Sequence, residues 1–121
     1  MRGNFGDKDK VHKDLFLLIE VLEKYLEAEF VVHCAYETDG HKSKGYHPRG
    51  MAADGHFETG IPLRDQYTLI ENCLELNNIE CGLGVYPHWN NKGFHLDVRG
   101  HKARWMRDKE GNYVGINIDE L

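Results

Sequence analysis

The amino-acid sequence predicts an α+β fold in which two main helices pack on one face of an antiparallel sheet. Residues 11–28 and 63–76 carry apolar side chains at three- and four-residue steps, which is the spacing of an amphipathic helix. Short β-branched and aromatic stretches between and after them are typical of strands. The order helix, strands, helix, strands favours helices that cover one face of a sheet.

The two helices have recognisable apolar stripes. The stripe of the first helix is Val11, Leu15, Leu18, Ile19, Leu22 and Leu26. Pro62 suits the first turn of the second helix, because proline lacks an amide hydrogen that this turn would leave unused. Asn77 and Asn78 mark the end of that helix.

Strands are expected within residues 30–36, 51–57, 79–86 and 95–99, followed by a hairpin of residues 103–107 and 113–118. The sequence Asp108-Lys109-Glu110-Gly111-Asn112 supplies the hairpin turn. Residues 1–9 are expected to form a flexible lead-in. Residues 38–46, with two glycines and two lysines, are expected to form a loop at the rim of the site.

Length and composition indicate a single domain, residues 1–121, with 40% hydrophobic residues to build its core. The net charge of -5 and the lack of a basic run argue against nucleic acid as a partner. The longest apolar run, residues 15–19, is too short for membrane insertion. Three cysteines cannot all pair within the chain, so reduced and mostly buried thiols are expected.

Two short stretches contain residues suited to a catalytic zinc site, which usually takes three His or carboxylate ligands. Pro48 and Gly50 disfavour a helix after His47, so His47 is expected on a loop and Asp54 on the strand that follows. His95 lies in the second stretch, where apolar and polar residues alternate as in a half-buried strand. The polar face of that strand could also be a surface ladder of charge pairs.

The motif His47-x-x-Gly50-x-Ala52-x-Asp54, followed about forty residues later by His95-x-Asp97, resembles the zinc D-Ala-D-Ala carboxypeptidase family. Relatives of that family include peptidoglycan endopeptidases, phage endolysins and the hedgehog signalling domain. The stretches Gly84-Val85-Tyr86-Pro87 and Ala103-Arg104-Trp105 are similar to a small bacterial and phage branch. The resemblance implies a hedgehog/DD-peptidase-like fold and Zn²⁺ bound by His47, Asp54 and His95.

Two positions differ from the pattern of many family members. A substrate- or oxyanion-binding arginine on the strand before the first motif is replaced by Glu37. An acidic or histidine base two or three residues before the second zinc histidine is replaced by Gly93 or Lys92. The base therefore lies elsewhere, or the domain binds its ligand without cleaving it.

Four residues are candidates for catalytic roles. Asp97 shares a strand face with His95, which makes it the first candidate for the general base. It could instead orient a ligand or pair with Arg99 or Arg49. His88, on the loop before this strand, is the second candidate for an acid or base. Arg49 and Arg99 are candidates to stabilise an oxyanion or to hold a substrate carboxylate.

Three other residues have open assignments. His41 could be an additional ligand, although no spacing supports it. His56 lies two residues beyond Asp54, where it could approach the metal, support a ligand or lie at the surface. Trp89 could cover the core or contact the substrate.

The sequence and the resemblance together predict a zinc metallopeptidase, a hydrolase of peptide bonds in bacterial peptidoglycan that is carboxypeptidase-like or endolysin-like. A zinc-stabilised binding module without turnover and a virion or structural protein with a decayed site are the alternatives. A cell-wall peptide is the expected partner, and the oligomeric state is left open. Because residues 1–10 carry no secretory signal, we expect a phage or prophage lysis or virion protein that reaches the cell wall without export.

Overall fold

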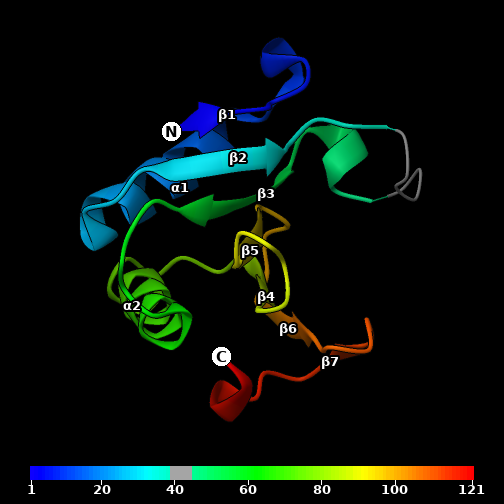
Figure 1. The fold of residues 1–121 in the computed structure, drawn as a ribbon. Coiled ribbons are helices and arrows are strands. Elements are labelled where there is room, and N and C mark those ends of the chain that lie inside the picture. Colours follow the sequence, from blue (N-terminus) through cyan, green and yellow to red (C-terminus); the bar gives the residue numbers. More distant parts are fainter. Residues whose placement is uncertain (39–44) are drawn as a thin grey trace.

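A computed structural model describes residues 1–38 and 45–121 and shows, within them, a seven-stranded sheet and two long helices (Figure 1). The strands are β1 (Arg2–Gly3), β2 (Phe30–Cys34), β3 (Ala52–Phe57), β4 (Gly82–Tyr86), β5 (Gly93–Asp97), β6 (Ala103–Arg107) and β7 (Tyr113–Val114). The helices are α1 (Lys13–Leu26) and α2 (Leu63–Leu76), with 3-10 turns η1 (Lys8–Lys10), η2 (His47–Arg49) and η3 (Ile118–Glu120). The α+β class is therefore confirmed.

The sheet is mixed, which corrects the prediction of an antiparallel sheet. The strand order is β1-β2-β3-β5-β4-β6-β7. The pairs β1·β2 and β4·β6 are parallel, whereas the other four pairs are antiparallel. After the β4–β5 hairpin the chain passes back beside the start of β4, so β6 runs in the same direction as β4. Local sequence patterns do not record such a return.

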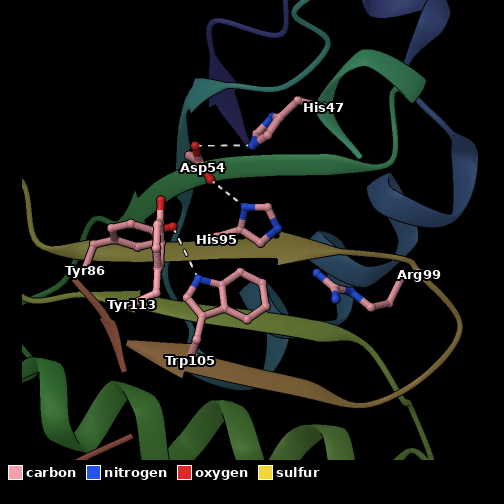
Figure 2. Close-up of a pocket in the computed structure, with 7 residues that line it drawn as sticks. All are labelled: His47, Asp54, Tyr86, His95, Arg99, Trp105 and Tyr113. Carbon is pink, nitrogen blue, oxygen red and sulfur yellow. Dashed lines mark hydrogen bonds and ion pairs between the residues drawn. The ribbon is translucent and has the colours of Figure 1, made fainter. Parts of the chain in front are cut away.

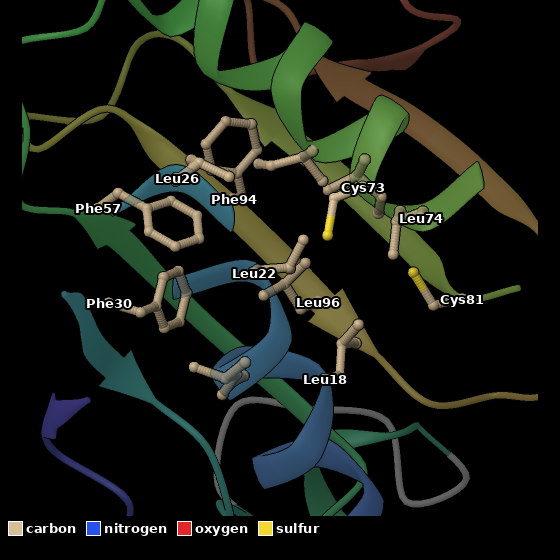
Figure 3. Close-up of a cluster of buried hydrophobic side chains, with 14 of the residues drawn as sticks. Leu18, Leu22, Leu26, Phe30, Phe57, Cys73, Leu74, Cys81, Phe94 and Leu96 are labelled. Atoms are coloured by element: carbon tan, nitrogen blue, oxygen red, sulfur yellow. The ribbon is translucent and has the colours of Figure 1, made fainter. Parts of the chain in front are cut away.

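Both long helices cover the same face of the sheet, as predicted. The buried side of α1, which includes Leu18 and Leu22, and that of α2, which includes Cys73, share one apolar cluster with Phe94 and Leu96 of β5 (Figure 3). Alternate residues of each strand enter this cluster, because successive side chains of a strand point to opposite faces. No helix in the described ranges is long and apolar enough to cross a membrane.

The N-terminal residues are ordered against the domain, unlike the flexible lead-in that the sequence indicated. Arg2 and Gly3 pair in parallel with Val31 and Val32 of β2. The amino group of Met1 lies 2.8 Å from Glu23 Oε2. A two-residue strand is too short to produce a periodic pattern, so it could not be predicted from the sequence.

Several predicted boundaries shift by a few residues. Helix α1 begins at Lys13, where the His12 ring accepts a hydrogen bond from the Asp14 amide, and it ends before Glu27 in the left-handed region. Strand β2 ends at Cys34, after a register shift against β3. The expected strand over residues 113–118 is limited to β7, and η3 follows. The turn Asp108–Asn112 joins β6 and β7 as predicted.

An ion pair joins α2 to strand β6. Both oxygens of Glu71 accept hydrogen bonds from Arg104, at 2.9–3.1 Å. Arg104 also donates to the Cys81 carbonyl at 2.6 Å, and the Tyr67 hydroxyl donates to Glu71 at 2.6 Å. Burial alone would raise the pKa of Glu71, but the bonds from Arg104 and Tyr67 outweigh it and lower that pKa.

We expect Glu71→Gln to lower the free energy of unfolding by about 1–3 kcal/mol at pH 7, since it weakens charge-assisted hydrogen bonds. Because the pKa of Glu71 is lower in the folded state, the ionised carboxylate stabilises the fold at pH values above the unfolded pKa of about 4.3. This stabilisation is lost as the pH falls through the folded pKa. Urea unfolding at pH 7 and pH 3 should therefore show a smaller difference from wild type at pH 3.

The matched control is Glu75→Gln, on the same helix, since the Glu75 side chain is exposed. It should leave the free energy of unfolding nearly unchanged at both pH values. An effect of Glu71→Gln that is equal at pH 7 and pH 3 would contradict the electrostatic explanation.

Candidate metal centre

Three residues of types that bind metals meet on the sheet face opposite the helices (Figure 2). Asp54 of β3 lies directly opposite His95 of β5 in the antiparallel register. His47 comes from η2, just before β3. Gly50 ends η2 with φ +69°, and a Cβ there would lie 1.9 Å from the Lys10 carbonyl oxygen. Glycine thus allows the sharp return that brings His47 over β3.

The three side chains present their polar atoms to one point. Asp54 Oδ1 lies 2.9 Å from His95 Nδ1, and Asp54 Oδ2 lies 3.3 Å from His47 Nε2. One potential ligand atom from each residue lies within 4.8 Å of the other two. Two imidazoles and one carboxylate are a donor set that suits zinc and other divalent metals. The predicted set of three is therefore brought together and could hold a metal ion.

The second nitrogen of each imidazole has its own partner. His47 Nδ1 lies 2.9 Å from the Ala35 carbonyl oxygen, to which it must donate. In the neutral ring Nε2 therefore carries no proton and can bind a metal ion, whereas in the protonated ring Nε2 donates to Asp54. His95 Nε2 lies 2.8 Å from Asp97 Oδ2. Outer contacts of this kind fix the tautomer and the orientation of metal-binding histidines.

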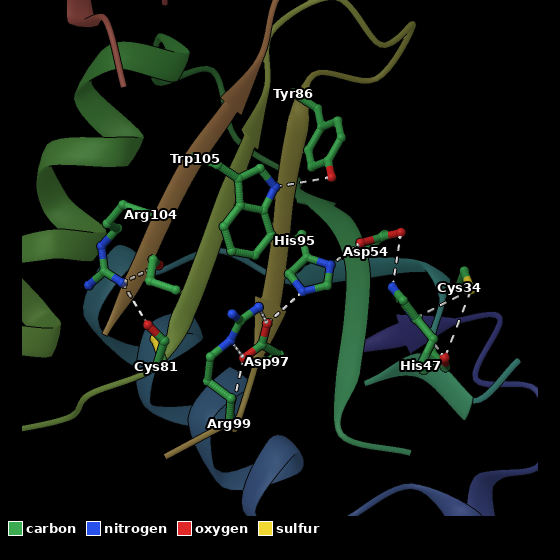
Figure 4. Close-up of polar contacts among 12 residues, drawn as sticks. Cys34, His47, Asp54, Cys81, Tyr86, His95, Asp97, Arg99, Arg104 and Trp105 are labelled. Atoms are coloured by element: carbon green, nitrogen blue, oxygen red, sulfur yellow. Dashed lines mark hydrogen bonds and ion pairs between the residues drawn. The ribbon is translucent and has the colours of Figure 1, made fainter. Parts of the chain in front are cut away.

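Asp97 is fully buried and both of its oxygens are engaged (Figure 4). Arg99 donates to Oδ1 through Nε at 2.8 Å and to Oδ2 through Nη2 at 2.7 Å. The Arg99 guanidinium lies over the rings of Tyr46 and Trp105, at 4.5 and 5.2 Å from their centroids. Asp97 therefore pairs with Arg99 and contacts His95, which are the two alternatives to the role of general base.

Two glycines of β4 make room for this arrangement. A Cβ at Gly82 would lie 2.2 Å from Asp97 Oδ2, and one at Gly84 would lie 2.4 Å from Trp105 Nε1. The Trp105 ring lies 5.0 Å from the His95 ring, and its Nε1 donates to the Tyr86 hydroxyl at 3.4 Å. The two glycines thus let a buried carboxylate and an indole lie flat against the sheet.

The electrostatic environment favours a cation at His95. Burial would raise the pKa of Asp54, but hydrogen bonds from His47 and His95 hold it well below its usual range. Burial would likewise raise the pKa of Asp97, but Arg99 and His95 hold it low. Burial would lower the pKa of His95, yet the two carboxylates raise it. A proton on the ring or a metal ion beside it would satisfy both carboxylates.

A cavity of about 460 Å³ opens over the three donors. Four further residues line it: Tyr86, Arg99, Trp105 and Tyr113. The three aromatic members were not expected as site residues. Trp105 could have been assigned to one face of its strand, because alternation along residues 103–107 sets it on the same face as Ala103 and Arg107.

The other two catalytic candidates do not line this cavity. His88 is exposed and lines a separate cavity of about 220 Å³ with Arg107 and Lys109. Arg49 is exposed, donates through Nε to the Gly45 carbonyl at 3.3 Å and lies over the Tyr46 ring. Neither is among the described residues that line the 460 Å³ cavity.

Of the three residues whose roles the sequence left open, the structure describes two. His56 Nδ1 lies 2.6 Å from His33 Nε2, so His56 pairs with another histidine outside the cluster. Trp89 is half-buried and stacks on Tyr86 with ring centroids 4.1 Å apart. His41, like most of the expected rim loop, lies outside the residues that the structure describes.

Cys34 lies beside the cluster, and its thiol is bonded to a residue outside it. Its Sγ is 3.7 Å from His47 Nδ1 and donates to Glu37 Oε2 at 2.8 Å. Burial, followed by the hydrogen bond to Glu37, raises the pKa of the Cys34 thiol.

Comparison with known proteins does not assign the chain to a family. No family model matches it, and neither a curated protein nor a solved structure gives a match. The account of the site therefore depends on its own residues.

We expect Gly82→Ala to lower the free energy of unfolding by about 1–3 kcal/mol, the usual scale for overfilling a tightly packed place. The atom in the way belongs to a side chain, but Arg99 and His95 hold that carboxylate, so it cannot turn aside without losing hydrogen bonds. Gly60→Ala is the matched control, because no atom lies within 4 Å of a Cβ there. Denaturant unfolding curves that shift equally for both variants would contradict this account.

Proposed function

We propose that the protein is a zinc-dependent peptidase or amidase that cleaves peptide bonds of the bacterial cell wall. One observation carries the proposal: the polar atoms of His47, Asp54 and His95 converge, and the outer nitrogen of each imidazole has a fixed partner. Hydrolytic zinc sites typically use three protein ligands and leave one position open. The choice of cell-wall peptides rests on the motif resemblance described above.

The donor set fits zinc in number, type and surroundings. His47 and His95 would each offer one imidazole nitrogen, and Asp54 would offer a carboxylate oxygen. A bound zinc ion supplies Lewis-acid chemistry and makes water a stronger acid at neutral pH. The adjoining cavity gives a substrate access to this point.

The side chains around the donors have separable tasks in this proposal. Asp97 holds the His95 ring through its contact with Nε2, and Arg99 holds Asp97 in turn by donating to it. Tyr86 lines the cavity, and burial raises the pKa of its hydroxyl to about 12. It is therefore protonated at neutral pH and can donate a hydrogen bond to a substrate carbonyl oxygen.

A second candidate function is a zinc-stabilised binding module without turnover. A specific observation favours it: apart from the three donors, no carboxylate or imidazole is among the described residues that line the 460 Å³ cavity. Asp97 has both oxygens engaged by Arg99 and His95, and His88 lines a different cavity. A general base for hydrolysis is thus not evident among these residues.

The metal is tested first. We expect one zinc ion per chain after dialysis, measured by elemental analysis of untagged protein, and its loss in His47→Ala and His95→Ala. His101→Ala is the control, because His101 is exposed outside the cluster. Full retention of zinc by both cluster variants would overturn the assignment of the ligands.

Asp97 is tested by the same zinc titration together with turnover. If Asp97 orients His95, Asp97→Asn should weaken zinc affinity by roughly ten- to a hundredfold, the usual effect of losing an outer partner of a ligand. If Asp97 is instead the general base, zinc affinity should be unchanged while turnover falls by roughly a hundredfold or more. The geometry leads us to expect the first result.

Digestion of purified peptidoglycan separates the two candidate functions. The zinc-loaded protein should release peptide fragments that mass analysis identifies by the addition of one water. Asp54→Asn should abolish release, because it removes the negative charge that offsets the metal while keeping the side-chain shape. Binding to peptidoglycan without any new fragment would favour the non-catalytic module.

A further inference from the structure

Asp54 lines a second cavity besides the one over the donors. The first has a volume of about 460 Å³ and the second about 380 Å³, and Asp54 lines both. The second is also lined by His33, Cys34, Trp89, Asn90 and Asn91. Asp54 therefore lies between two hollows, each within the usual size range of ligand sites.

The second hollow has a fixed aromatic wall. The Trp89 ring stacks on Tyr86 at 4.1 Å with an interplanar angle of 14°. It also lies 5.5 Å from the His33 ring, which is held by His56 at 2.6 Å. Asn90 and Asn91, exposed on the turn between β4 and β5, add amide donors and acceptors next to this wall. Such a surface suits the backbone and side chains of an uncharged peptide segment.

Among the described residues that line the two hollows, Arg99 is the single lysine or arginine, and it is paired with Asp97. The described residues that line the second hollow include no lysine or arginine. The first hollow contains Arg99, but its Nε and Nη2 donate to Asp97. An enzyme that removes a C-terminal residue must bind a free carboxylate, ordinarily through charge-assisted hydrogen bonds.

We propose that a peptide substrate occupies both hollows and that the protein cleaves an internal peptide bond between them. Hydrolysis adds one water across the amide, so one hollow retains the new carboxylate and the other the new amine. Trp89 is then a specificity-determining residue, because it forms the wall of the second hollow. The inference rests on the proposed peptidase function and specifies its mode of action.

Stem peptides isolated from cell-wall digests, with the C-terminal carboxylate either free or converted to a methylamide, test the inference. Conversion to the amide should change kcat/KM for zinc-loaded protein by less than about threefold, because no terminal carboxylate is bound. Removing residues from either end of the substrate should lower kcat/KM by about tenfold or more, since binding energy from remote parts of a substrate is used in the transition state.

The variant Trp89→Ala distinguishes a role in substrate binding from a purely structural role. It should lower kcat/KM by about tenfold for long substrates and hardly at all for substrates too short to reach the second hollow. Asn91→Ala should show the same dependence on length with little risk to folding, because Asn91 is exposed. Tyr25→Ala, a change of an exposed aromatic residue on α1, should leave all rates unchanged.

The outcomes distinguish this inference from the proposed function. Release of only the C-terminal residue, together with loss of activity on the methylamide, would overturn the two-sided groove and leave a zinc peptidase. A Trp89→Ala effect that is equal for long and short substrates would also overturn it. If zinc-loaded protein hydrolyses neither stem peptides nor whole peptidoglycan, both proposals fall.

Discussion

The antiparallel register of β3 and β5 is the constraint on which the rest of the site depends. It sets Asp54 opposite His95 and Ala52 opposite Asp97. On the other face, Ala53 of β3 and Phe94 and Leu96 of β5 are buried against the helices. A slip by one residue would exchange the two faces. The apolar core therefore fixes the geometry of the polar site, and a change that weakens one should disturb the other.

Small residues let the polar face hold a charged network. Ala52, Gly82 and Gly84 lie next to Asp97 or Trp105 in the sheet, where larger side chains would fill the space. A buried carboxylate is costly unless it is paired, and Asp97 is paired with Arg99 and His95. The small residues and the Asp97–Arg99 ion pair thus depend on one another, since the small residues leave the space that the paired side chains fill.

Most of the fold and the metal donors could be predicted from the sequence, because those signals are local. Periodicity identified α1 and α2, and residue type with spacing identified His47, Asp54 and His95. The parallel pairing of β6 with β4 depends on how distant segments meet, which no local pattern records. His88 and Arg49 are close to the motifs in the sequence, yet neither is among the described residues that line the 460 Å³ cavity, because contact with a cavity depends on how the connecting segments fold.

The distribution of the site between strands and loops has a consequence for its evolution. Asp54 and His95 lie on central strands, and Ala35 and Asp97 restrain the imidazole rings of His47 and His95. Walls of the cavities come from less constrained elements: Trp89 from the β4–β5 turn and Tyr113 from the edge strand β7. Loops and edges tolerate substitution better than paired central strands. The residues of the cavity walls can therefore change while His47, Asp54 and His95 stay in place.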